Sequence, residues 1–186
     1  MRESSPPSPW VKRFLAAVRP GGRILDVACG SGRHTLVAAS LGFAVTGIDR
    51  DISKARKQVE ACAALPAVDL IEGDLESGDP WPFAPASFDA VVVANYLWRP
   101  ILPDIVATLA TSGVLIYETF GLGNERLGRP SNPDFLLHPG ELLKAVEGRL
   151  VPIAYEHLRM ESPDRVVQRL CALGPDHEGL RMPPRL

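Results

Sequence analysis

Cysteine is scarce in this chain, and its few cysteines lie far apart. Cys29, Cys62 and Cys171 form no Cys-x-x-Cys pair, and the four histidines do not cluster with them. A disulfide framework or a zinc site needs close and repeated spacing of such residues. The sequence therefore predicts no metal site and a reducing compartment, the cytoplasm.

Long apolar runs are missing as well. No run approaches the roughly 18 residues that a membrane-spanning helix needs. The first ten residues, "MRESSPPSPW", contain no apolar core of a signal peptide. We therefore expect a cytoplasmic protein without a membrane partner.

The chain also has no excess of charge of one sign. The chain has 20 Lys and Arg against 22 Asp and Glu, a net charge of −2, so we expect no nucleic-acid partner. The length of 186 residues suits one domain with a sizeable core. We expect that domain to span 1–186 as a monomer or homodimer, with a cap helix within 1–20 and a loose tail at 175–186.

Strand patterns and helix patterns alternate along the chain. The predicted strands are 23–29, 44–49, 68–74, 87–97, 113–120, 150–160 and 165–174, and the helices between them are 33–42, 51–65, 103–110 and 141–148. This alternation predicts an α/β fold with a doubly wound, Rossmann-like, mostly parallel seven-stranded sheet. The turn "ESPD" joins the last two strands into a C-terminal antiparallel hairpin. A ligand site belongs at the carboxyl ends of the parallel strands.

A glycine loop follows the first predicted strand, in the stretch "ILDVACGSGRHT" at 24–35. A triphosphate loop would continue from its last glycine with Lys and Ser or Thr, whereas Arg33 and His34 stand there. A dinucleotide loop would have a third glycine where Thr35 stands. Asp49, at the end of the second strand, has the spacing of an acid that binds a ribose diol.

Asp26 separates the remaining alternatives. It interrupts an apolar strand end four residues before Gly30, and burying a carboxylate costs several kcal/mol unless it is paired or hydrogen-bonded. A pyrophosphate gains nothing from a nearby anion, but a ligand with an ammonium or sulfonium does. The alternative is that Asp26 only ties down the glycine loop, and both roles can coexist.

Four stretches together resemble a known family. "LDVACGSG", "GIDRD", "IEGDLES" and "FDAVVVANYL" are similar, in order and spacing over about residues 23–120, to the motifs of class I S-adenosylmethionine-dependent methyltransferases. The terminal hairpin resembles the reversed last strand of that family. The short N-terminal helix and the compact size resemble its tellurite-resistance-type small-molecule branch.

The resemblance implies S-adenosylmethionine as cofactor and S-adenosylhomocysteine as product. By matching position, Asp26, Gly30 and Gly32 would hold the methionyl end, where glycine lets the backbone approach the ligand. Asp49 would accept hydrogen bonds from both ribose hydroxyls.

The same resemblance implies a set of residues around the adenine and the sulfonium. Arg50 would flank the edge of the adenine, Asp74 would accept from its amino group, and Leu75 would pack on its ring. Asn95, at the end of the fourth strand, lies where the family places residues beneath the sulfonium.

Two further segments are candidates for the acceptor side. In "NYLWRP" (95–100), Tyr96, Trp98 and Arg99 follow the central strand, although Trp98 has an alternative role in packing under the next helix. The longest irregular segment is 120–140, and irregular segments of that length are usually functional or disordered. We expect an ordered flap with several polar groups available to the acceptor: Glu118, Asn124, Arg126, Arg129 and His138.

Two residues near the glycine loop have a structural and a functional interpretation. Packing is the favoured role of Cys29, over that of a nucleophile. His34 is either a surface residue at the helix start or a contact of the cofactor carboxylate.

Methyl transfer from a sulfonium is a direct in-line displacement that needs alignment and desolvation but no metal. His138 and Tyr96 are the candidates for proton handling, and a thiol or a chalcogen oxyanion would need no strong base. The function predicted is therefore methyl transfer to a small-molecule acceptor. Two alternatives remain: a catalytically silent S-adenosylmethionine-binding regulator, and a nicotinamide-dependent oxidoreductase.

Overall fold

The computed structural model describes residues 6–62, 65 and 68–184. Its centre is a seven-stranded sheet with the strand order β3-β2-β1-β4-β5-β7-β6. The strands are β1 (Arg23–Val27), β2 (Ala44–Asp49), β3 (Val68–Glu72), β4 (Phe88–Ala94), β5 (Leu109–Phe120), β6 (Val151–Glu161) and β7 (Asp164–Leu173). The first five are parallel, and β7 runs antiparallel to both β5 and β6. The predicted Rossmann-like α/β fold is confirmed.

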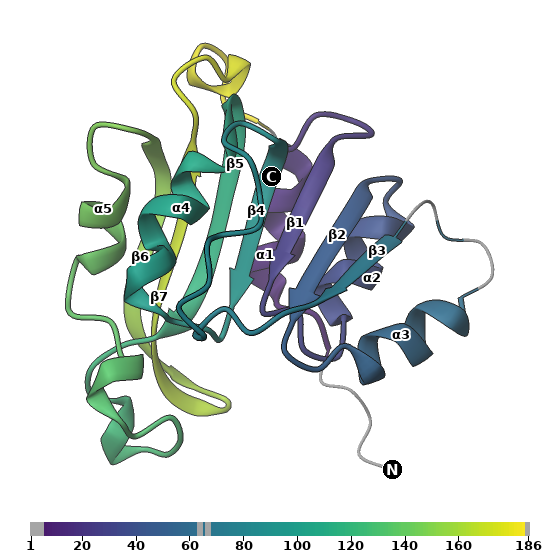
Figure 1. Cartoon of the computed structure of the whole chain (residues 1–186). Coiled ribbons are helices and arrows are strands. Elements are labelled where there is room, and N and C mark those ends of the chain that lie inside the picture. The colour runs from purple at the N-terminus through teal and green to yellow at the C-terminus, as the bar shows by residue number, and fades with distance from the viewer. Residues whose placement is uncertain (1–5, 63–64, 66–67, 185–186) are drawn as a thin grey trace.

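Helices cover both faces of this sheet (Figure 1). They are α1 (Pro9–Phe14), α2 (Arg33–Ser40), α3 (Ser53–Glu60), α4 (Leu102–Ala107) and α5 (Glu141–Val146). The face that carries α4 and α5 buries one apolar cluster, and the face that carries α1 and α2 buries another. The sheet is thus the middle layer of three, as a doubly wound fold requires.

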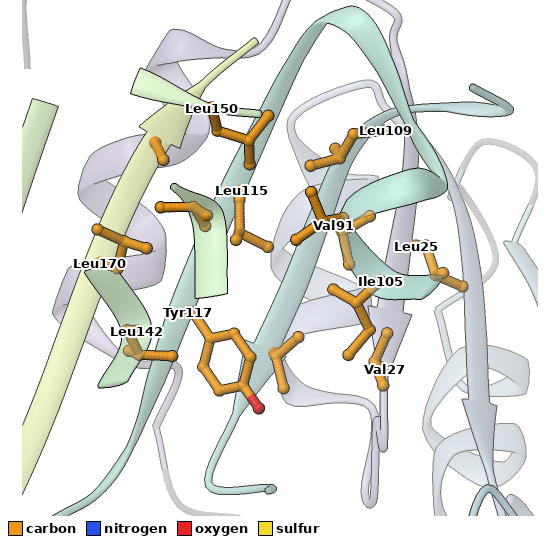
Figure 2. Packing of buried hydrophobic residues seen from close by; sticks show 14 of the residues in the cluster. Leu25, Val27, Val91, Ile105, Leu109, Leu115, Tyr117, Leu142, Leu150 and Leu170 are labelled. Carbon is orange, nitrogen blue, oxygen red and sulfur yellow. The ribbon is translucent and has the colours of Figure 1, made fainter. Parts of the chain in front are cut away.

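The two clusters follow from the period of two in each strand. In β4, Val91 and Val93 belong to the cluster beneath α4 and α5, whereas Ala90 and Val92 belong to the one beneath α1 and α2. Figure 2 shows the first cluster, with Tyr117 of β5 at its lower end. A strand buried on both faces has no polar alternation, which explains the continuous apolar run in the sequence.

The amino-terminal helix is anchored by its cap. Ser8 accepts a hydrogen bond from the Trp10 N–H at 3.1 Å, and Pro9 opens the helix where its missing N–H is harmless. Trp10 and Phe14 then pack on the sheet, with ring centroids 4.6 Å apart. The helix predicted within 1–20 is therefore part of the core on one face.

The parallel registers bring the carboxyl ends of five strands to one edge. Asp26 of β1 lies beside Gly47 of β2, and Asp49 of β2 lies beside Glu72 of β3. The chain changes direction across the sheet between β1 and β4, the topological switch point at which ligands bind in this architecture. In Figure 1 this is the lower edge, where the arrowheads of β1, β2 and β4 point.

The predicted flap and the predicted loose tail both contain short helices. Residues 121–140 contain the short 3-10 helices Asn124–Arg126 and Pro133–Phe135, and they lie at the same lower edge as the strand ends (Figure 1). The tail contains the 3-10 helix Glu178–Leu180, and the buried His177 lies 3.0 Å from the carbonyl oxygen of Ala17. In the part of the chain that the structure describes, no helix is long and apolar enough to span a membrane.

Candidate functional site

A cavity of about 580 Å³ opens at the carboxyl edge of the sheet. One side of its wall comes from the ends of β2 and β3, the other from the ends of β4 and β5 and from the segment 121–140. This volume lies within the range of sites for small molecules and cofactors, roughly 300–1,000 Å³. Five of the eight residues predicted to bind the cofactor line it: Asp49, Arg50, Asp74, Leu75 and Asn95.

Asp49 is held in place by backbone groups. One carboxylate oxygen accepts from the Gly30 N–H at 2.8 Å, and the other accepts from the Asp51 N–H at 3.1 Å. A carboxylate oxygen has room for two hydrogen bonds, so each retains a lone pair for a ligand. Asp49 is thus an oriented acceptor for a pair of hydroxyls.

The end of β3 contributes a second acceptor. Asp74 accepts from the Glu76 N–H at 2.9 Å, and Leu75 between them is half-buried against the core. Arg50 lines the same side of the cavity and is exposed. An apolar side chain between hydrogen-bonding groups is what a purine ring needs.

Two residues at this edge have a backbone that side chains rarely adopt. Ala28, after β1, has φ of 52°, and Asn95, after β4, has φ of 58°. Asparagine tolerates the left-handed region, whereas alanine does so at a cost. The Asn95 N–H donates to the Glu118 carbonyl oxygen at 2.8 Å, which fixes the bend. Strained backbone of this kind gathers at functional sites.

Asp26 lies beneath the glycine loop and is not among the residues that line the cavity. It is 2% exposed and accepts from the Thr35 hydroxyl at 2.7 Å. Burial raises its pKa to about 6, although the bond from Thr35 acts in the opposite direction. This bond ties the end of β1 to the first turn of α2.

The two loop glycines have backbone conformations that favour glycine. Both have positive φ, 58° at Gly30 and 78° at Gly32. A Cβ on Gly32 would approach the Ala55 Cβ to 3.0 Å, so this position is closed to larger residues on two grounds. Neither glycine lines the cavity, and Gly30 acts through its bond to Asp49.

The two candidates for proton handling lie in different places. Tyr96 lines the cavity, and its hydroxyl is buried without a hydrogen-bond partner among the described residues. Burial and the nearby carboxylate of Glu76 raise the pKa of Tyr96 above its ordinary value, so it stays protonated at neutral pH. His138 is exposed and outside the cavity wall.

Arg99 has a structural task. Its guanidinium binds Glu141 at 2.7 and 3.0 Å, and donates to the carbonyl oxygens of Asp134 at 2.5 Å and Leu136 at 2.8 Å. The backbone N–H of His138 donates to the same Glu141 at 2.7 Å. Arg99 therefore fastens the segment 133–141 to the end of β4. Trp98, half-buried, does not line the cavity.

The segment 120–140 contributes apolar side chains to the cavity: Phe120, Pro130 and Phe135. The sequence interpretation named its polar residues instead. Asn124 is buried and bonds the Pro130 carbonyl oxygen and the Val166 N–H, and Glu118 is buried against Arg169 at 2.5 Å. Arg126 and Arg129 are exposed. Thr119 and Leu97 line the cavity and were also missed; their position at strand ends was the available signal.

Two residues near the glycine loop are buried and structural. Cys29 is buried, and burial raises its pKa to about 12, which leaves no thiolate at neutral pH. His34 is buried, accepts from the Ser8 N–H at 3.1 Å, and has its pKa lowered by burial to about 4. Within the described residues, no group of three His, Cys, Asp or Glu could hold a metal ion.

Comparison with known protein families matches residues 24–112 to a model described as a methyltransferase domain. Among curated proteins, the chain is 30% identical over 128 residues to a Bacillus subtilis protein named as methyltransferase YqeM. The match covers 61% of this chain and 49% of YqeM, so the chain spans about half the length of that relative.

Solved structures share the fold. Haemophilus influenzae TehB superposes with a TM-score of 0.73 at 15% identity, over 93% of this chain and 64% of TehB. A Burkholderia thailandensis 1,6-didemethyltoxoflavin-N1-methyltransferase, solved with bound 1,6-didemethyltoxoflavin and S-adenosylhomocysteine, superposes with a TM-score of 0.67 at 16% identity, over 90% of this chain and 77% of that one.

Proposed function

We propose that this chain, which matches a methyltransferase domain over residues 24–112 and shares the fold of S-adenosylmethionine-dependent methyltransferases, transfers the cofactor's methyl group to a small-molecule acceptor by direct in-line displacement. One observation carries this proposal. Residues predicted from the sequence to bind an adenosyl group and a sulfonium meet in one cavity at the topological switch point.

The charges of the cavity fit this cofactor. Its wall carries three carboxylates, Asp49, Asp74 and Glu76, against the single guanidinium of Arg50. Such a wall attracts the ammonium and the sulfonium of S-adenosylmethionine and repels a pyrophosphate. The dinucleotide alternative is disfavoured on this ground.

The residues of the chain bind and align. Asp49 would accept from the ribose hydroxyls with the lone pairs that its two backbone donors leave free, and Asp74 would accept from the adenine amino group. Leu75 would pack on the purine ring. Asn95, held in its bend, would lie beneath the sulfonium, which when bound supplies a methyl group activated by positive charge.

The chain supplies position more than proton transfer. Tyr96 keeps its proton at neutral pH and His138 lies outside the cavity wall, so neither is placed to act as a strong base. Alignment and exclusion of water therefore carry the rate enhancement in this proposal.

Two solved structures support the predicted branch of the family and the predicted class of acceptor. The likeness to TehB over 93% of this chain is compatible with the tellurite-resistance-type layout. The didemethyltoxoflavin enzyme acts on a small molecule, which supports the same acceptor class here. A single domain over 1–186, a cytoplasmic location and a monomer or homodimer complete the proposal.

Methyl transfer is tested by incubating the protein with methyl-labelled S-adenosylmethionine and a panel of small acceptors, beginning with thiols, tellurite, selenite and aromatic heterocycles. We expect labelled product and S-adenosylhomocysteine in equal amounts for at least one acceptor. Cofactor binding without any product across the panel would favour the silent regulator. Absence of both binding and product would overturn the proposal.

A further inference from the structure

The cavity has two sides of different chemistry. All of its charged residues lie at or after the ends of β2 and β3: Asp49, Arg50, Asp74 and Glu76. If the nucleoside lies over these strands, as the proposed function holds, the methyl group points toward the ends of β4 and β5. That acceptor side is lined by Tyr96, Leu97, Thr119, Phe120, Pro130 and Phe135.

The acceptor side carries no formal charge among the described residues that line it. Arg99, which fastens the segment 133–141 behind this wall, is already bound by Glu141 and two carbonyl oxygens. A desolvated oxyanion needs a cation or several N–H donors, and its burial without them costs many kcal/mol. A cationic acceptor would be repelled by the sulfonium. An uncharged acceptor fits this wall.

Aromatic rings dominate the same wall. Tyr96, Phe120 and Phe135 are half-buried and come from three separate parts of the chain. Pro130 and Leu97 fill the space between them with apolar surface. Planar ligands gain from stacked or edge-to-face contacts with such rings in addition to the burial of area.

None of the side chains assigned to the acceptor side is a base, and the carboxylate near Tyr96, that of Glu76, belongs to the residues after β3. The polar groups of the acceptor side are the Tyr96 phenol, which stays protonated, and the hydroxyl of the buried Thr119. A phenol or alcohol acceptor would need its proton removed before attack, whereas a neutral nitrogen or sulfur attacks with its own lone pair.

From these contacts we infer that the methyl acceptor is an uncharged aromatic molecule whose attacking atom is a neutral nitrogen or sulfur, an inference that rests on the proposed function. The acceptor's lone pair forms the new bond to the methyl carbon as the carbon–sulfur bond breaks, and that bond's electron pair returns to sulfur as a thioether. The positive charge passes to the acceptor. A ring nitrogen that carries no proton keeps this charge after methylation. A nitrogen or sulfur that carries a proton releases it to water and becomes neutral.

The test uses two calorimetric titrations of the intact protein. The first, with S-adenosylhomocysteine alone, reports the proposed function. The second adds quinoline or isoquinoline, and separately tellurite or selenite, to the protein saturated with S-adenosylhomocysteine. We expect both uncharged heterocycles to bind and neither oxyanion to bind.

Two variants locate the heterocycle site. Phe135→Ala is expected to weaken quinoline binding about tenfold, as loss of an aromatic anchor does, while S-adenosylhomocysteine affinity stays within about twofold. Phe83→Ala is the matched control, because Phe83 is half-buried between Trp81 and Phe88 and does not line the cavity. It should leave both affinities unchanged.

The outcomes separate the two proposals. Failure of S-adenosylhomocysteine to bind overturns the proposed function and this inference with it. If S-adenosylhomocysteine binds but tellurite or selenite binds as well, this inference alone is overturned. The same holds if S-adenosylhomocysteine binds and neither heterocycle does. Equal loss of quinoline binding in Phe135→Ala and Phe83→Ala would also overturn it, because the aromatic wall would then not be the site.

Discussion

Tyr96 illustrates how burial decides what a reactive side chain can do. Its ring faces the cavity, but its hydroxyl is buried and has no hydrogen-bond partner in the part of the chain that the structure describes. Desolvation and the carboxylate of Glu76 favour the protonated form and raise the pKa. The side chain therefore supplies an aromatic surface and is not a base near neutral pH.

Replacing Tyr96 by phenylalanine should consequently stabilise the protein or leave its stability unchanged. An unpartnered buried hydroxyl costs about 1–3 kcal/mol, and Tyr96→Phe removes that cost. The free energy of unfolding from urea titration should not fall. In Tyr155→Phe, the matched control, it should fall by about 1 kcal/mol, since the Tyr155 hydroxyl accepts from the Gly140 N–H at 3.1 Å. Equal destabilisation of both variants would show that the Tyr96 hydroxyl is bonded.

At the scale of elements, the site depends on a connection between the end of β4 and the segment 133–141. Arg99 makes four hydrogen bonds across this connection, two to Glu141 and two to carbonyl oxygens. Phe135 lies within the segment that these bonds hold. The aromatic wall is thus positioned by a residue that does not itself line the cavity.

Arg99→Met keeps an unbranched side chain and removes all four bonds. We expect amide hydrogen exchange across 133–141 to become faster and the free energy of unfolding to fall by about 1–2 kcal/mol. Affinity for S-adenosylhomocysteine should change little, because Arg99 does not line the cavity. Arg159→Met is the control, since its bidentate pair with Asp164 is exposed and lies on the β6–β7 hairpin. Unchanged exchange across 133–141 in Arg99→Met would contradict this account.

The regular elements and the strand-end residues could be predicted from the sequence, because hydrophobic periodicity fixes both. Asp49, Asp74 and Asn95 each lie at or just after the end of a strand, so parallel pairing brings them to one edge. The residues of 121–140 have no period to reveal which side chains turn inward. Polarity alone favoured Arg126, Arg129 and His138, whereas burial of apolar surface turned Pro130 and Phe135 toward the cavity.

At the scale of the whole molecule, two buried groups near the glycine loop give opposite dependences of stability on pH. His34 has a pKa of about 4 in the folded chain against an ordinary 6.5, so the unfolded chain binds more protons between these values. Its contribution to the free energy of unfolding is fully present above pH 6.5. About 3 kcal/mol of it is lost as the pH falls toward 4. Asp26 has a pKa of about 6 against 3.8, so the folded chain binds more protons and gains about 3 kcal/mol as the pH falls through that range.

Removing either group should expose the effect of the other. From pH 7 to pH 4, His34→Gln should gain free energy of unfolding relative to the wild-type protein, and Asp26→Asn should lose it, each by about 3 kcal/mol. Urea titrations of the three proteins at both pH values measure this, because contributions of all other groups cancel in the difference. An equal change in the free energy of unfolding between the two pH values, in wild type and in both variants, would show that neither group is desolvated as the structure has it.

The central claim is that the cavity at the strand ends binds S-adenosylmethionine. The most direct measurement is calorimetric titration with S-adenosylmethionine, S-adenosylhomocysteine and NAD, on wild type, Asp49→Asn and the exposed control Asp69→Asn. The account predicts affinities on the order of micromolar for both adenosyl ligands, at least about tenfold weaker in Asp49→Asn, unchanged in Asp69→Asn, and none for NAD. Absence of adenosyl binding, or binding of NAD in its place, would contradict it.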